Sequence, residues 1–299
     1  MSRDGIHQPV LLEEVVAWAP PQATYIMDGT MGHGGHTIAL CRALQPTQLV
    51  GVDRDQQMIR KAQQRIAEEW YTELVTSVQG SYADMETNAA ALWWPDKKFS
   101  LILLDIGVNM EHFKDAERWF SLKHDAPLDM RYDMTTWMTA SEWLMSVTYD
   151  EVHHALAQRT DFGDRMRDSL VHWLLQERKR KPLTSTYDLV QRGAQNGLTP
   201  KRQAVLFQAV RIAVNQELQQ LEEFLRICPA WVEKGWRVIV ISYHSGEDRM
   251  VKQAFKDREQ QGKGNILTKS VITPKRQEIK TNKAARSAKM RVFACADVS

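Results

Sequence analysis

The chain has little cysteine. Its three cysteines, Cys41, Cys228 and Cys295, lie far apart, and an odd number provides no disulfide framework. The sequence also lacks Cys-x-x-Cys pairs and the cysteine and histidine spacings of structural zinc sites. These absences argue against a disulfide-stapled or zinc-stabilised fold, and they lead us to expect a reduced, cytoplasmic protein.

Long apolar runs are missing as well. No stretch of 18 apolar residues occurs, and residues 1–10, MSRDGIHQPV, lack the apolar core of a signal peptide. We therefore expect no membrane segment and no secretory leader. The 299 residues, 43% of them hydrophobic and 25% charged, fit one large globular domain or one domain that carries an insertion.

Acidic residues are scarce in one C-terminal segment. Between Lys263 and Arg291 the chain carries nine lysines and arginines, and only Glu278 opposes them. Two interpretations of this segment stay open: it contacts a phosphate backbone, or it is a solvated basic stretch without a partner.

The first third of the chain alternates between strand and helix patterns. Strands are expected at 25–27, 48–55, 74–79 and 99–109, and helices at 37–44 and 56–70. The run FSLILLDIGVN (99–109) is continuously apolar at its start, which is typical of a strand buried on both faces. The alternation predicts a parallel, doubly wound sheet.

The pattern becomes helical between Asp115 and Gln203, and we interpret this segment as an insertion. A long helix is then expected over 205–228, followed by strands at 235–245 and 288–296. The sheet domain would therefore comprise 1–114 and 204–299, and the helical insertion 115–203.

A glycine-rich loop, DGTMGHGGHT (28–37), follows the first expected strand and precedes a helix. Ligands of open α/β sheets bind outside the carboxyl ends of the strands. Asp53 ends the second strand, where an acidic residue can bind ribose hydroxyls, and Asp105 ends the buried strand. Together these positions predict a cofactor that contains adenosine.

The loop favours S-adenosylmethionine over a nicotinamide dinucleotide. It lacks the G-x-G-x-x-G register, and Asp28 at its head would oppose a pyrophosphate but suits a cationic amino group and a sulfonium. His33 and His36 are three residues apart, but no third ligand with matching spacing is visible, so we expect no metal.

Several blocks of sequence are more specific than the loop. They include HQPVLLEEV (7–15), DGTMGHGGHT (28–37), LLDIGV (103–108), PLDMR (127–131), FQAVRIAVNQELQQLE (207–222) and HSGEDR (244–249). In these blocks, in their order and over nearly the whole length, the chain resembles the RsmH (MraW) family of ribosomal RNA methyltransferases. The resemblance implies a class I S-adenosylmethionine-dependent methyltransferase fold, a Rossmann-like doubly wound sheet with a helical insertion domain that recognises RNA.

The resemblance also implies an activity, partners and site residues. The family methylates N4 of a cytidine in small-subunit (16S) ribosomal RNA, so the implied partner is ribosomal RNA or the small ribosomal subunit, with no membrane. The oligomeric state stays open, with a homodimer as one option. The positions that match the family's S-adenosylmethionine contacts are Gly34, Gly35, His36, Asp53, Tyr82, Asp105 and His112.

The chemistry of an exocyclic amine suggests catalytic residues. The amine of cytosine is a weak nucleophile because its lone pair is delocalised into the ring, so it must be aligned and offered a hydrogen-bond acceptor. We expect Asp105 and Asn109 to do this, and no cysteine lies nearby for covalent attack at C5. Five residues are expected on the RNA side: Asp129, Arg131, His244, Glu247 and Arg249. The alternative for PLDMR and HSGEDR is a buried salt-bridge network that supports the sheet.

The departures from the family pattern gather away from the cofactor loops. Asn109 and Met110 replace two serines, HSGEDR replaces HSLEDR, and an arginine is lost at position 205. Two alternatives therefore stay open: methylation of a different RNA site, or an RNA-assembly factor that binds S-adenosylmethionine with weak or no activity. An NAD-linked oxidoreductase is a third alternative, which the loop register disfavours.

Overall fold

The computed structural model describes residues 8–90, 98–107, 125–135, 138–157 and 163–296. The chain divides into two compact units. The first comprises Met1–Gly107 and Gln219–Ser299, and the second comprises Val108–Leu218. The sheet lies in the first unit.

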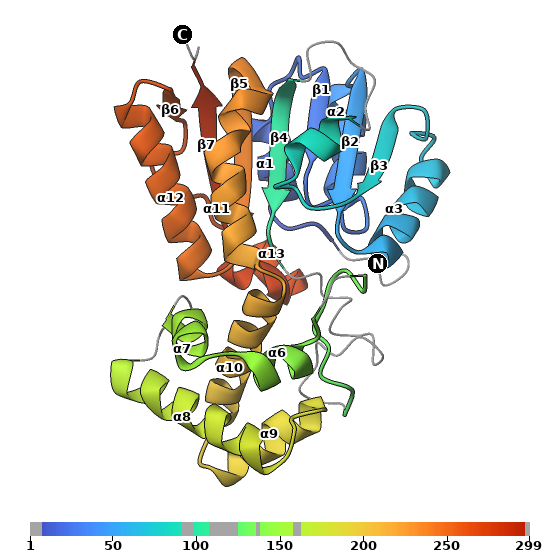
Figure 1. The fold of residues 1–299 in the computed structure, drawn as a ribbon. Coiled ribbons are helices and arrows are strands. Elements are labelled where there is room, and N and C mark those ends of the chain that lie inside the picture. Colours follow the sequence, from blue (N-terminus) through green and yellow to red (C-terminus); the bar gives the residue numbers. More distant parts are fainter. Residues whose placement is uncertain (1–7, 91–97, 108–124, 136–137, 158–162, 297–299) are drawn as a thin grey trace. The chain divides into compact units, whose positions relative to one another are not determined.

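The first unit contains a seven-stranded sheet with the order β3-β2-β1-β4-β5-β7-β6 (Figure 1). Its strands are β1 (Tyr25–Asp28), β2 (Gln48–Asp53), β3 (Val75–Gln79), β4 (Phe99–Asp105), β5 (Val232–Ser242), β6 (Gly264–Ile266) and β7 (Lys289–Cys295). Strands β1 to β5 are parallel, as expected, but β7 runs antiparallel to both β5 and β6. The parallel sheet predicted from the alternating pattern therefore carries one antiparallel strand at this edge. The chain enters β7 at the carboxyl end of β5, where Lys289 pairs with Ser242.

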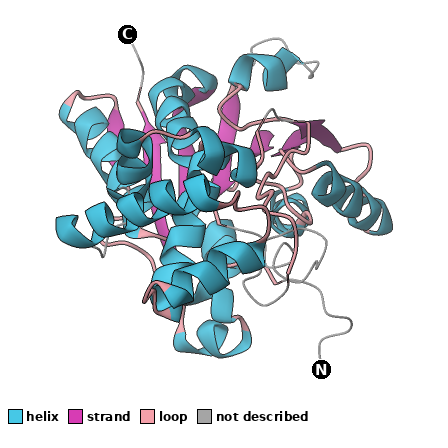
Figure 2. Ribbon diagram, turned by 60° about the horizontal axis from the view of Figure 1, so that its bottom comes forward, coloured by secondary structure: helices cyan, strands magenta, loops and turns pink. Residues whose placement is uncertain are grey.

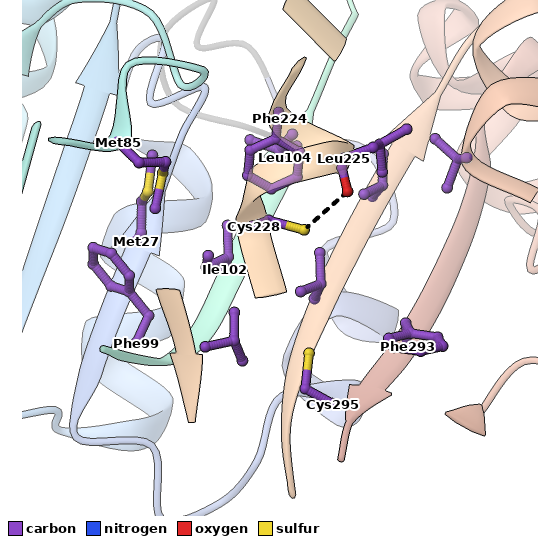
Figure 3. Packing of buried hydrophobic residues seen from close by; sticks show 14 of the residues in the cluster. Met27, Met85, Phe99, Ile102, Leu104, Phe224, Leu225, Cys228, Phe293 and Cys295 are labelled. Carbon is purple, nitrogen blue, oxygen red and sulfur yellow. Dashed lines mark hydrogen bonds between the residues drawn. The ribbon is translucent and has the colours of Figure 1, made fainter. Parts of the chain in front are cut away.

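Both faces of this sheet are buried. Ile26, Leu101 and Leu103 belong to one hydrophobic cluster, whereas Met27 and Leu104 belong to the other. Successive side chains of a strand point to opposite faces, so this division shows a sheet covered on both sides. Figure 3 shows the second cluster, in which Met27 and Leu104 lie with Phe224 and Cys228. In Figure 2, helices flank the magenta strands.

The helices of the first unit are α1 (Leu12–Trp18), α2 (Gly35–Leu44), α3 (Gln56–Glu68), α4 (Met85–Ala90), α11 (Glu217–Ile227), α12 (Ser245–Gln260) and α13 (Arg276–Thr281), with α11 beginning two residues before the boundary. Two short 3-10 helices, η1 (Cys228–Trp231) and η2 (Lys283–Ser287), precede β5 and β7. Within the described part of the chain, no helix combines the length and the hydropathy needed to cross a bilayer.

The helix expected over 205–228 is interrupted. The structure has α10 (Pro200–Val214) and α11, separated by Asn215 and by Gln216, whose φ is 52°. The Asn215 side chain donates to the carbonyl oxygen of Met130 at 2.7 Å, and it accepts from the amide of Tyr132 at 2.9 Å. These long-range bonds stabilise the break, which helix propensity alone does not reveal.

The second unit is helical in its described part. It contains α6 (Ala140–Ser146), α7 (Tyr149–Ala157), α8 (Asp164–Arg180), α9 (Thr186–Gln195) and α10. Leu206, Phe207 and Val210 of α10 are buried in the same cluster as Leu144 and Leu174. The unit therefore extends to Leu218, beyond the boundary of 203 expected for the insertion, because α10 packs with these helices.

Candidate functional site

The glycine-rich loop connects β1 to α2, and Asp28 closes its beginning. One carboxylate oxygen of Asp28 accepts from the amide of Thr30 at 3.2 Å, and the other accepts from the hydroxyl of Thr37 at 2.7 Å. Asp28 is fully buried, and this burial raises the pKa of its carboxyl, while the charge of His36 acts in the opposite direction. Asp28 therefore has a supporting place beneath the loop.

Two glycines lie where the loop enters α2. Gly34 has a φ of 74°, a conformation that favours glycine, and it occupies the N-cap of the helix. A Cβ atom on Gly35 would lie 2.4 Å from Cγ of Pro9, so the N-terminal segment packs directly on the loop. The backbone amides of this first helical turn carry partial positive charge, which suits a carboxylate or hydroxyl of a ligand.

Asp53 joins the end of β2 to the loop. Its Oδ2 atom accepts from the amide of Gly32 at 2.8 Å, and its Oδ1 atom accepts from the amide of Asp55 at 2.8 Å. A carboxylate is chemically suited to accept from a ligand hydroxyl. β2 ends at Asp53, the expected strand end, and Asp55 is the N-cap of α3.

Tyr82 lies in the turn after β3, beside the start of the loop. A Cβ atom on Gly29 would approach Cβ of Tyr82 to 2.9 Å. The Tyr82 ring packs edge-on against Phe224 of α11, with centroids 5.7 Å apart and planes at 87°. The structure thus brings the loop, Asp53 and Tyr82 to one edge of the sheet.

Asp105 ends β4 at the same edge. Its amide donates to the hydroxyl of Thr30 at 2.6 Å, its Oδ2 atom lies 3.4 Å from Nε2 of His36, and its Oδ1 atom accepts from the hydroxyl of Tyr243 at 2.8 Å. His36 is only 6% exposed, and its Nδ1 atom has no hydrogen-bond partner among the described residues. A buried, unpartnered imidazole nitrogen at a loop of this kind fits a site for a polar ligand.

Sequence reasoning did not find Tyr243. It lies 138 positions from Asp105 and directly before HSGEDR. A single aromatic residue at the end of an expected strand does not by itself predict a site residue. The contact is nevertheless consistent with a parallel sheet, in which the carboxyl ends of β4 and β5 lie close together.

His244 and Glu247 form the N-terminal cap of α12. The Oε2 atom of Glu247 accepts from the amides of Tyr243 and His244, at 2.9 and 3.2 Å. Its Oε1 atom lies 2.7 Å from Nε2 of His244, whose Nδ1 atom accepts from the amide of Glu247 at 3.3 Å. Both residues are buried, whereas Arg249 is exposed. Arg249 is thus the member of this group that is open to solvent.

Asp129 and Arg131 form a pair in the second unit. The Nε and Nη2 atoms of Arg131 donate to the two oxygens of Asp129, at 2.7 and 2.8 Å. The two residues therefore lie in a different unit from His244, Glu247 and Arg249. Asn109 and His112, the remaining site predictions, lie outside the described residues.

Metal ligands are not grouped in the described part of the chain. No three or more histidine, cysteine, aspartate or glutamate side chains come together there in a way that could hold an ion.

Comparison with known proteins identifies the family. The model of the MraW methylase family matches residues 4–296. The chain belongs to this family. Among its relatives, ribosomal RNA small subunit methyltransferase H of Coprothermobacter proteolyticus is 34% identical over 302 residues, which cover 96% of this chain and 95% of the relative. The protein of the same name from a Cyanothece species is 35% identical over 294 residues, which cover 96% and 94%.

The solved structures are less similar. The structure of an rRNA methylase from Streptococcus thermophilus aligns over 99% of both chains, at 9% identity and a TM-score of 0.43. The fold assignment rests on membership of the family and on the observed strand order.

Membership of the MraW methylase family confirms the resemblance seen in the sequence. The seven-stranded sheet, buried on both faces, is the class I methyltransferase fold that was expected, and S-adenosylmethionine is the cofactor of this methylase. The residues present fit that cofactor, since the loop offers a glycine at positive φ, a helix N-terminus and the unpartnered Nδ1 atom of His36.

Proposed function

We propose that this member of the MraW methylase family transfers a methyl group from S-adenosylmethionine to the exocyclic N4 of a cytidine in small-subunit ribosomal RNA. The proposal rests on the position of Asp105, whose carboxylate is held at the same edge of the sheet as the glycine loop. The relatives are named for small-subunit ribosomal RNA, and kinship of about one third identity over nearly the whole chain supports the same class of substrate.

The cofactor would be held by residues at the carboxyl edge of the first unit. Gly34, Gly35 and His36 would contact it at the start of α2, Asp53 would bind the ribose hydroxyls, and Tyr82 would flank the adenine. S-adenosylmethionine supplies, when bound, a methyl group on a positively charged sulfur. The buried carboxylate of Asp28 stabilises the loop from beneath, through Thr30 and Thr37.

Asp105 acts on the nucleophile. Its side chain is 16% exposed, so it is open to a ligand although Tyr243 and His36 contact its two oxygens. A carboxylate that accepts a hydrogen from the amine orients N4 and raises the electron density on nitrogen. When the new N–C bond forms, the bond from the methyl carbon to the cofactor's sulfur would break and its electron pair would stay on the sulfur, leaving a neutral thioether. N4 would become positively charged and release a proton, which the carboxylate of Asp105 would accept. Asn109 would assist as a second acceptor, and His112 would complete the cofactor contacts.

The RNA side of the proposal involves the helical insertion of 115–203 and five residues: Asp129, Arg131, His244, Glu247 and Arg249. The partner is ribosomal RNA or the assembled small subunit. The Asp129–Arg131 pair and the His244–Glu247 cap are held by bonds within the protein, so they would shape the surface. Arg249 is exposed and suits direct contact with a phosphate.

The test incubates the full chain with labelled S-adenosylmethionine and with small-subunit RNA or particles. The RNA and the particles come from cells that lack this protein. Mass analysis of nucleosides and of RNA fragments is expected to show N4-methylcytidine at a single position, and Asp105→Ala is expected to abolish its formation. A different methylated nucleoside would move the activity to another RNA site. Binding of S-adenosylmethionine without methyl transfer would show that the chain is not a methyltransferase and would favour an RNA-assembly factor.

A further inference from the structure

Groups from separate parts of the first unit hold Asp105, one at its backbone amide and two at its carboxylate. Thr30, in the loop after β1, accepts from its amide. His36, in α2, faces its Oδ2 atom, and Tyr243, after β5, donates to its Oδ1 atom at 2.8 Å. Rotation of the carboxylate would break the Tyr243 bond, because that hydroxyl reaches one oxygen only. One lone pair on each oxygen remains for another donor.

Tyr243 is itself firmly placed. Its backbone amide donates to Glu247 at 2.9 Å, which ties it to the cap of α12. Its ring lies against Gly107, where an added Cβ atom would come within 2.3 Å of Cε2. Gly107 thus provides the room through which the ring reaches Asp105 from the neighbouring strand.

The hydroxyl of Tyr243 keeps its proton. Burial, and then the charge of Asp105, raises the pKa of Tyr243 well above its ordinary value. The side chain is therefore a permanent hydrogen-bond donor toward Asp105 at neutral pH.

We propose that Tyr243 is a positioning residue for methyl transfer, whose hydroxyl holds the Asp105 carboxylate in the orientation that receives the cytidine amine. This inference rests on the proposed function, because it assigns Tyr243 a role through Asp105. An interaction that orients the acceptor acts in the transition state more than in substrate binding. Its loss therefore lowers kcat and leaves the affinity for cofactor and RNA nearly unchanged.

The test is Tyr243→Phe, which removes only the hydroxyl. We expect kcat for cytidine methylation to fall about tenfold or more, while the Kd for S-adenosylmethionine and the KM for RNA stay within about twofold. Tyr71→Phe is the matched control. It removes the hydroxyl of a tyrosine of the first unit that interacts with Arg42, a residue outside the proposed site. This control should leave kcat unchanged.

Two further variants separate positioning from general support. Gly107→Ala should push the ring aside and lower kcat as Tyr243→Phe does. In an Asp105→Asn background, Tyr243→Phe should cause no additional loss of kcat, because the carboxylate that Tyr243 positions is already absent. Wild-type kcat in Tyr243→Phe, or an equal loss of kcat and cofactor affinity, overturns the inference. Failure of the proposed function is a distinct result, because the wild-type chain itself would then form no N4-methylcytidine.

Discussion

The carboxylate of Asp53 accepts a hydrogen bond from the backbone amide of Gly32 at 2.8 Å. This bond links the end of β2 to the middle of the glycine loop, 21 positions earlier in the chain. The residue expected to bind the ribose therefore also sets the position of the loop. The proposed ribose contact and the geometry of the loop would then depend on one side chain.

Replacing Asp53 should affect both roles. Asp53→Ala removes the bonds to Gly32 and Asp55 together with the proposed ribose contact, so we expect the Kd for S-adenosylmethionine to rise at least about tenfold. Asp53→Asn keeps one oxygen and should show a smaller loss. Titration calorimetry measures both. Equal, wild-type affinity in the two variants would contradict the assignment of Asp53 to the cofactor.

Gly34 offers a test with a control of the same backbone conformation. Gly34 and Gly197 have φ values of 74° and 80°, and alanine at either should lower the free energy of unfolding by about 1 kcal/mol. A Cβ atom added to Gly34 would lie 3.3 Å from Cβ of Ala62, whereas a Cβ atom added to Gly197 would have no atom within 4 Å. Only Gly34→Ala should also weaken cofactor binding. Equal affinities in the two variants would show that the loop tolerates this change.

Asp28 should make stability depend on pH. Its folded pKa is raised by burial, so its contribution to stability is complete below the unfolded pKa of about 4 and is lost as the pH rises through the folded value. Asp28→Asn can keep the bonds to Thr30 and Thr37 without a buried charge. We therefore expect the stability of this variant, relative to wild type, to increase from pH 4.5 to pH 8, as measured by denaturant unfolding.

Asp248 should make stability depend on pH in the opposite direction. Burial opposes its ionisation, but bonds and charge from Arg291 and Lys289 outweigh burial and lower its pKa. Its contribution is present above the unfolded pKa and is lost as the pH falls through the folded pKa. Asp248→Asn should therefore lose stability at neutral pH and approach wild type in acid. If both variants changed in the same direction with pH, the two assignments could not both be right.

Much of the sheet could be predicted because its signals are local. The apolar runs of β1, β2 and β4 and the glycine loop between β1 and α2 are recognisable without tertiary information. Their side chains are buried on both faces, as continuous apolar runs indicate. The positions of Asp53 and Asp105 followed from a general rule, that parallel strands bring their carboxyl ends to one edge.

The rest depended on contacts between distant residues. The helix break at Asn215 is stabilised by Met130 and Tyr132, more than 80 positions away, while the local sequence favours a continuous helix. The antiparallel direction of β7 depends on its pairing with β5. The bond from Tyr243 to Asp105 has the same origin. The local sequence pattern does not predict any of these three features.

Glu247 and Arg249 were both expected on the RNA side, yet their surroundings differ. Glu247 is buried and accepts from two backbone amides, whereas Arg249 is exposed. Arg249→Ala should leave the free energy of unfolding within about 0.5 kcal/mol of wild type, because it changes an exposed position. It should raise the KM for RNA, and the salt dependence of RNA binding should weaken by about one phosphate contact.

Glu247→Ala is the contrasting variant. It should lower the free energy of unfolding by about 1–2 kcal/mol, since it breaks the cap of α12, and it should lower kcat because Tyr243 loses an anchor. Denaturant unfolding and RNA binding at several salt concentrations measure both variants. An unchanged salt dependence in Arg249→Ala would remove this residue from the RNA interface, and an unchanged stability in Glu247→Ala would contradict the role of the cap.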